Sequence, residues 1–144
     1  TWSATLDGPG TCDGEPVHAS TRTELAKALV ATGFGYAASR RARQAEVLRE
    51  VLPSVRDIRR AGAASLDLCA VAAGQVDAYY EQGLKPWDHA AGALVARRAG
   101  ALVGGLHGRP AGERLVVAGP PVLFEALVGL LERLRADEDV PLDT

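Results

Sequence analysis

The segment Glu81-Gln82-Gly83-Leu84-Lys85-Pro86-Trp87-Asp88 joins two parts of the chain with different periodicities. Before it, residues 76–81 alternate in the manner of a strand. After it, residues 87–98 are typical of a helix, which Pro86 introduces and Gly100 ends. Strand followed by helix is the repeating unit of α/β domains, whose binding sites tend to lie in loops beyond the strand ends.

Strand and helix signals alternate on both sides of this loop, which predicts an α/β layered domain. The helix at 39–52 is the clearest example, because its apolar residues recur at helical spacing and Pro53 ends it. The other expected helices are a short one after Ser20 or Thr21, then 63–73 and 121–134. The other expected strands are 2–6, 17–19, 28–33, 55–58, 101–106 and 115–118.

We expect three parts along the chain: a hairpin at 1–20, a carboxyl-terminal α/β domain at 21–136 and a frayed acidic tail at 137–144. The hairpin begins with a strand that has no lead-in, and a sheet that starts in mid-strand implies a missing edge partner. The sequence therefore predicts a longer protein, of which the hairpin is a remnant of the amino-terminal sheet.

Composition restricts the classes of function. A net charge of −2 gives no support to nucleic-acid binding. No apolar run reaches the roughly 18 residues of a membrane span, and no secretory signal is recognisable. Cys12 and Cys69 do not form a disulfide framework, which favours a cytoplasmic location. The unclustered histidines are expected to be plain surface or cap residues: His18, His89 and His107.

The first turns of two predicted helices are candidate functional sites. Asp88 falls in the first turn of its helix, where unpaired N–H groups keep a carboxylate ionised, as a magnesium ligand must be. The commoner role of an acid at that position is a helix cap. Residues 60–65 enter the other helix with small side chains, which would let a phosphate approach the amides, although close packing on a sheet demands the same residues.

Three segments, 62–69, 72–83 and 85–92, together resemble the inositol monophosphatase family and its bacterial members in particular. The last one matches the family's second signature, a Trp-Asp pair followed by small residues and a closing Ala-Gly at 99–100. The resemblance covers most of residues 15–130. It implies the carboxyl-terminal half of the sugar-phosphatase fold, a layered α-β-α sandwich with a mixed sheet.

The resemblance also implies roles for single residues. Asp88 matches an aspartate that binds metal and lies near the substrate hydroxyls. Glu81 matches a glutamate that hydrogen-bonds a substrate hydroxyl, and Ala64 matches a residue that lines the substrate pocket. Arg60 and Asp67 match motif positions with a structural or interface role.

The implied cofactor is Mg²⁺, but the family's other ligands are absent from this sequence. In the family they are a glutamate and the two aspartates of an Asp-Pro-Ile-Asp-Gly-Thr stretch in upstream segments. Magnesium usually takes one or two carboxylates together with the substrate phosphate, so one aspartate cannot build a two-metal centre. We expect the remaining ligands to come from an amino-terminal half, and these 144 residues alone to be inactive.

The function implied for the parent protein is hydrolysis of a polyol phosphomonoester, with inositol 1-phosphate as the default substrate and a homodimer as the expected assembly. Histidinol phosphate, a nucleotide bisphosphate and fructose bisphosphate are alternative substrates that the sequence does not separate. A different class also stays open. If 144 residues is the native length, the chain would act as a non-catalytic binding or dimerisation module.

Overall fold

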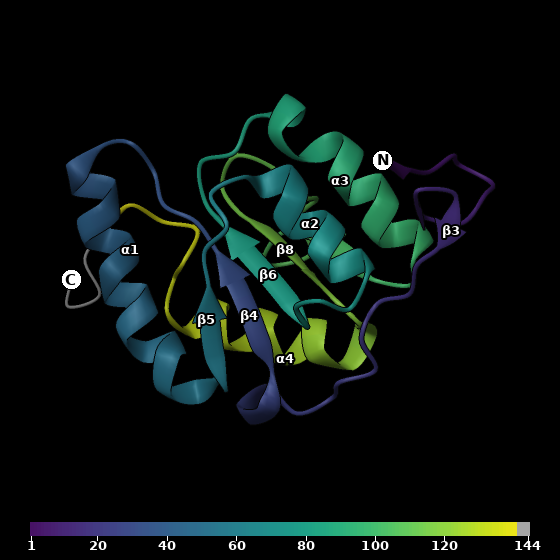
Figure 1. The fold of residues 1–144 in the computed structure, drawn as a ribbon. Coiled ribbons are helices and arrows are strands. Elements are labelled where there is room, and N and C mark those ends of the chain that lie inside the picture. The colour runs from purple at the N-terminus through teal and green to yellow at the C-terminus, as the bar shows by residue number, and fades with distance from the viewer. Residues whose placement is uncertain (141–144) are drawn as a thin grey trace.

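A five-stranded mixed sheet forms the centre of the computed structural model, which describes residues 1–140 (Figure 1). The strands lie in the order β5 (Asp57–Arg59), β4 (Leu29–Thr32), β6 (Ala78–Glu81), β8 (Val116–Gly119) and β7 (Leu102–Gly104). β4 pairs in parallel with β5 and β6, whereas β8 pairs antiparallel with β6 and β7. The mixed sheet is the one predicted.

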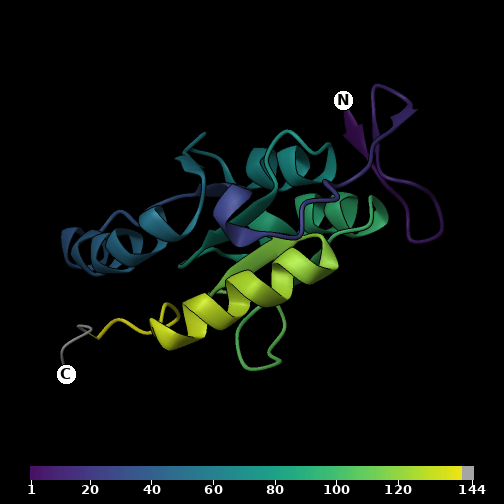
Figure 2. The same ribbon diagram turned by 90° about the horizontal axis from the view of Figure 1, so that it is seen from below.

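Helices cover both faces of this sheet, so the predicted layered α-β-α sandwich is confirmed (Figure 2). α2 (Ala64–Ala72) and α3 (Pro86–Arg98) pack on one face. α1 (Ala38–Val51) and α4 (Pro121–Arg133) pack on the other. Two short 3-10 helices complete the set, η1 (Leu25–Lys27) and η2 (Leu52–Ser54). Within residues 1–140, no helix is long and apolar enough to cross a membrane.

Neighbouring residues of the central strands pack in opposite layers of the core. In β4, Val30 packs with α1 and α4, whereas Ala31 packs with α2 and α3. Tyr80 and Tyr79 of β6 divide in the same way. Successive side chains of a strand point to opposite faces, so a strand covered on both sides is apolar throughout. Burying each large apolar side chain contributes roughly 1.5–3 kcal/mol, which stabilises both layers.

A small antiparallel sheet of β1 (Trp2–Ser3), β2 (Thr11–Cys12) and β3 (Glu15–Pro16) lies beside the carboxyl end of α3 (Figure 1). The prediction of a return strand at 17–19 is wrong. Asp13 and Gly14 both have positive φ, 50° and 86°, which makes a tight two-residue turn and places the return strand directly after it.

The segment after Ser20 is not the helix that its capping residues predict; the only helical turn there is η1. The Ser20 hydroxyl donates a hydrogen bond of 2.5 Å to Asp77, which also accepts one of 2.8 Å from the Leu29 N–H. The same oxygen accepts a 3.0 Å bond from the Arg22 N–H, as a capping serine would, but no helix begins there. The bond to Asp77 helps to anchor the chain to the start of β4. Cys12 and Cys69 are both free, as predicted.

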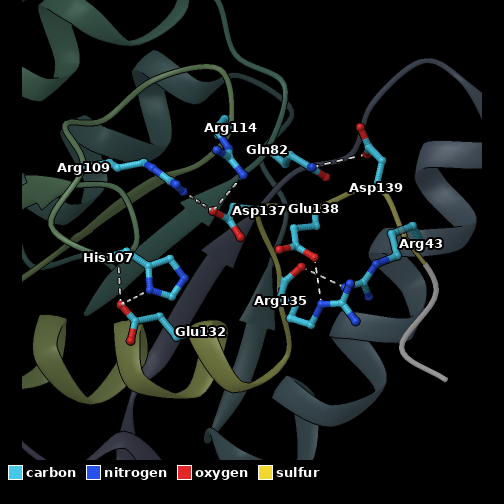
Figure 3. A network of polar contacts seen from close by, with 10 residues as sticks. All are labelled: Arg43, Gln82, His107, Arg109, Arg114, Glu132, Arg135, Asp137, Glu138 and Asp139. Carbon is cyan, nitrogen blue, oxygen red and sulfur yellow. Dashed lines mark hydrogen bonds and ion pairs between the residues drawn. The ribbon is translucent and has the colours of Figure 1, made fainter. Parts of the chain in front are cut away.

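The prediction of a frayed acidic tail is wrong for Asp137 and Asp139, and residues 141–144 lie outside the described part of the chain. The Asp137 side chain is only 4% exposed and pairs with Arg109 at 3.2 Å and Arg114 at 3.8 Å (Figure 3). Asp139 bonds Arg40. Sequence patterns miss these contacts because the arginines come from distant parts of the chain.

Candidate functional site

A cleft of about 550 Å³ opens where the parallel strands β4, β5 and β6 end. Most of its lining comes from the segments that follow these strands, namely 33–37, 60–65 and 81–88. Parallel strands end at the same edge of a sheet, so the segments that follow them converge there. Glu81, Ala64 and Asp88, the three residues singled out in the sequence, all line this cleft.

Asp88 is the third residue of α3 and takes part in capping it. Its Oδ2 accepts a 2.8 Å hydrogen bond from the Lys85 N–H, and its own N–H donates to the Lys85 carbonyl at 2.9 Å. These reciprocal bonds satisfy backbone groups that the first turn leaves unpaired. The cap alternative is therefore confirmed. The same bond orients the carboxylate beside the cleft, while the metal-binding role of Asp88 stays a prediction.

Glu81 is the last residue of β6 and is half-buried. Burial is the main cause that raises the pKa of its carboxyl to about 7, and the negative charge of Asp67 raises it further. A side chain at Gly33 would place its Cβ 1.6 Å from Glu81 Oε1. A glycine after β4 therefore makes room for this carboxylate, a signal that sequence reasoning missed.

Asp67 and Tyr79 lie inside the protein close to Glu81. Asp67 is 3% exposed, and burial raises the pKa of its carboxyl to about 6, against the opposing charge of Arg60. Burial also raises the pKa of Tyr79, helped by the charge of Glu81. The Tyr79 hydroxyl lies close enough to Glu81 to lower the pKa of that carboxyl, whereas Asp67 Oδ2 meets no hydrogen-bonding partner within residues 1–140. Asp67 therefore acts on the site electrostatically.

Basic side chains contribute to two walls of the cleft. The Arg60 guanidinium lies over the Phe34 ring, 5.9 Å from its centre. Arg40, in the first turn of α1, forms the other basic wall and bonds Asp139 behind it. Lys85 does not line the cleft, and its Nζ donates to Glu113 at 2.6 Å. Sequence analysis assigned nothing to Arg40, because its segment carries no motif.

The residues that lead into α2, here called the α2 entrance, line the same cleft as Asp88. Ala63, Ala64 and Ser65 line it, and no side chain caps the first turn of α2. Gly62 has φ +94°, a conformation that glycine adopts freely. The exposed N–H groups of such a turn suit a phosphate. The structure supports a phosphate site at this cleft better than a metal site. Within the described residues, no three His, Cys, Asp or Glu side chains come together to hold a metal ion.

Comparison with known proteins gives a consistent result. A family model described as "Inositol monophosphatase family" matches residues 1–136. Inositol-1-monophosphatase SuhB of Mycobacterium tuberculosis is 51% identical over 119 residues, which are 82% of this chain and 41% of that protein. A "Putative Nus factor SuhB" of Neisseria meningitidis is 41% identical over 116 residues, 77% of this chain and 44% of that protein. The chain thus spans less than half the length of these relatives.

Solved structures show the same fold. The structure of Mycobacterium tuberculosis SuhB has a TM-score of 0.83 at 43% identity, covering 95% of this chain and 56% of that one. An inositol monophosphatase from Anabaena has a TM-score of 0.85 at 29% identity, covering 92% of this chain and 54% of that one. This chain therefore folds as about half of the sandwich seen in these structures, as expected.

Proposed function

Since this chain belongs to the inositol monophosphatase family, we propose that it is the carboxyl-terminal part of a Mg²⁺-dependent phosphatase that hydrolyses a polyol phosphomonoester, with inositol 1-phosphate as the first candidate. The observation that carries this proposal is the convergence of Asp88, Glu81 and the α2 entrance on one cleft. A metal ligand, an acceptor for hydroxyls and phosphate-binding amides are the groups that such a reaction requires.

Asp88 is the proposed metal ligand. A carboxylate suits Mg²⁺, and the Lys85 N–H holds this one at a defined angle, as a neighbouring donor does in known metal sites. The fit is partial, because the described residues offer no set of three ligating side chains. We propose that the other ligands come from a segment outside this chain. Bound Mg²⁺ would supply an activated water and stabilise the leaving oxygen.

Glu81 and Ala64 are the proposed substrate-binding residues. Because the pKa of Glu81 is raised to about 7, both of its forms are populated near neutral pH. The carboxylate form accepts hydrogen bonds from substrate hydroxyls. Ala64, at the start of α2, has a side chain small enough to leave the neighbouring N–H groups open to a phosphate. Each residue thus contacts a different end of a polyol phosphate.

The proposal extends to the parent protein: a cytoplasmic homodimer that acts on small sugar or polyol phosphates. A non-catalytic binding role is the second candidate, favoured by relatives whose names are Nus factors and not enzymes. A measurement of turnover distinguishes the phosphatase from the non-catalytic binding protein. A protein that adds the family's amino-terminal half to this chain should release phosphate from inositol 1-phosphate, whereas the 144-residue chain alone should not.

Asp88→Asn in that longer protein tests the site. The amide oxygen can still accept the bond from Lys85, so the melting temperature should change by about 2 °C or less. Turnover should fall by at least about 100-fold, because an amide is a poor substitute for an anionic ligand. Phosphate release and thermal unfolding are the two measurements.

Asp88→Ala is the matched control, since it removes the ligand and the cap together. It should lose the same activity and also about 0.5–1 kcal/mol of stability. If Asp88→Asn retained near-normal turnover, or if it lost as much stability as Asp88→Ala, the residue would be chiefly a cap and the proposed metal role would fail.

A further inference from the structure

Arg40 lies between the cleft and a second hollow at the first turn of α1. It contributes to the lining of both, and the second hollow is completed by Ala37, Ser39 and Asp139. On the cleft side, Arg40 lies against Gly83, where an added Cβ would come within 2.6 Å of Arg40 Nη1. The guanidinium therefore reaches the loop that begins at Glu81, with Asp139 on its other side.

Asp139 binds Arg40 with both carboxylate oxygens. Arg40 Nε donates to Oδ1 at 3.1 Å, and Nη2 donates to Oδ2 at 2.7 Å. Gln82 Nε2 donates a further, longer bond of 3.3 Å to Oδ1 (Figure 3). Asp139 thus connects the first turn of α1 with the residue that follows Glu81, and the paired carboxylate sets the position of the Arg40 side chain.

The segment that carries Asp139 is itself held in place. Arg43 Nη2 donates to the carbonyls of Leu134 and Arg135, both at 2.8 Å. Two residues before Asp139, the buried Asp137 pairs with arginines of the 105–115 loop (Figure 3). Ordering a surface ion pair costs side-chain entropy, which often cancels its energy. Here the neighbouring contacts already order the segment, so less entropy remains to be lost.

The ion pair with Asp139 changes which groups Arg40 can bind. A guanidinium has five N–H donors, and the bidentate bond uses two of them. The remaining donors include those of Nη1, which lies beside Gly83 at the cleft. The positive charge of the guanidinium is already balanced by Asp139, while the nearby Glu113 is paired with Lys85. This wall therefore offers hydrogen bonds without a net positive charge.

We propose that Asp139 is a specificity-determining residue, which holds Arg40 as a neutral pair so that the cleft accepts uncharged hydroxyls there and disfavours a second phosphate group. This inference rests on the proposed function, because it narrows the phosphomonoesters that the same cleft takes. A substrate that places its one phosphate at the α2 entrance and its hydroxyls at Arg40 fits both sides of the cleft. A bisphosphate brings its second anion toward the Arg40–Asp139 pair, where the guanidinium charge is already balanced by the carboxylate.

Asp139→Asn tests the inference, because the amide keeps the size of the side chain and removes its charge. The probes are inositol 1-phosphate and inositol 1,4-bisphosphate, titrated into the ¹⁵N-labelled 144-residue chain and followed by NMR. The variant should bind the bisphosphate about fivefold more tightly than the unchanged chain, since an unbalanced guanidinium binds phosphate strongly. Affinity for the monophosphate should stay within about twofold.

Two controls make the test specific. Glu138→Gln removes the same charge one residue away, from an ion pair with Arg135, and should leave both affinities unchanged. Adding Arg40→Gln to Asp139→Asn should abolish the gain, because the freed cation is then absent. An equal gain in Glu138→Gln, a gain that persists without Arg40, or no gain in Asp139→Asn would each overturn the inference. Failure of the proposed function is separate: the longer protein would then show no turnover of the monophosphate.

Discussion

At the scale of single residues, the chemistry of Glu81 depends strongly on its surroundings. It ends a buried strand, so its carboxyl is partly removed from water, and this raises its pKa to about 7. The charge of Asp67 acts in the same direction. A glutamate on an exposed strand end would be fully ionised at neutral pH. The placement of Glu81 therefore gives the cleft a group that changes charge in the physiological range.

The Glu81 titration can be measured directly. In a ¹³C-labelled chain, the side-chain carboxyl of Glu81 should titrate with a midpoint of about 7. Asp67→Asn should lower that midpoint, because it removes a nearby negative charge. Glu113 is an internal control in the same spectrum, since its bond from Lys85 holds its pKa below the usual 4.5. A Glu81 midpoint that coincided with that of Glu113 would contradict this description of the site.

At the scale of elements, Arg43 joins α1 to the end of α4. It is 5% exposed, and its Nη2 hydrogen-bonds two carbonyls at the carboxyl end of α4. Both carbonyls lie just past the last residue of α4, where the helix dipole favours a cation, and the Arg135 carbonyl also accepts a 3.1 Å bond from the Glu138 N–H. Arg43 Nε has no hydrogen-bond acceptor within residues 1–140, which reduces the net stabilisation. The contact nevertheless fixes the segment that leads to Asp139.

Arg43→Met should lower the free energy of unfolding by about 1–3 kcal/mol, because it removes the donor to the half-buried Leu134 carbonyl and one of the two donors to the Arg135 carbonyl. Urea denaturation followed by circular dichroism measures the change. Arg49→Met is the matched control: the same helix carries it on an exposed face, so its loss should cost about 0.5 kcal/mol or less. Equal losses in the two variants would mean that Arg43 contributes only helix propensity.

Sequence patterns locate the long helices and buried strands well, but not the short elements. The helix at 39–52 was placed within a residue of α1 because periodicity and Pro53 both mark it. The return strand was misplaced because a two-residue turn at Asp13 and Gly14 leaves little pattern to detect. The prediction of a helix after Ser20 is wrong: Ser20 does accept a bond from the Arg22 N–H, but it also binds the distant Asp77, a contact that no local pattern records.

At the scale of the whole molecule, the buried Asp67 makes stability depend on pH. Its pKa is about 6 in the folded protein and near 3.8 when exposed. Between these values the folded protein holds more protons than the unfolded chain, so stability falls as pH rises. The contribution is fully present below about pH 3.8 and is lost as pH passes through about 6. At neutral pH, folding must bury a charge that meets only partial compensation from Arg60.

Asp67→Asn removes this cost and should raise the free energy of unfolding at about pH 7 by about 1 kcal/mol, with little gain at about pH 4. Urea unfolding at the two pH values provides the measurement. Asp57→Asn is the control with the opposite sign, because the bond from Arg59 lowers the pKa of Asp57 and the variant loses the negative charge that this bond stabilises. A pH-independent effect of Asp67→Asn would show that its burial is not an electrostatic cost.

The sequence by itself determined the α/β class, the sandwich and the three residues Glu81, Ala64 and Asp88, which the structure brings to one cleft. The class follows from periodicity, and the sandwich and the three residues follow from the resemblance of short segments to a family; both kinds of signal are local. Only the tertiary structure decided that Asp88 takes part in the cap of its helix, that burial shifts the pKa of Glu81 and that Asp139 pairs with Arg40. Burial depends on the sum of surrounding elements, and the Arg40–Asp139 contact joins residues 99 positions apart. No pattern along the chain records either property.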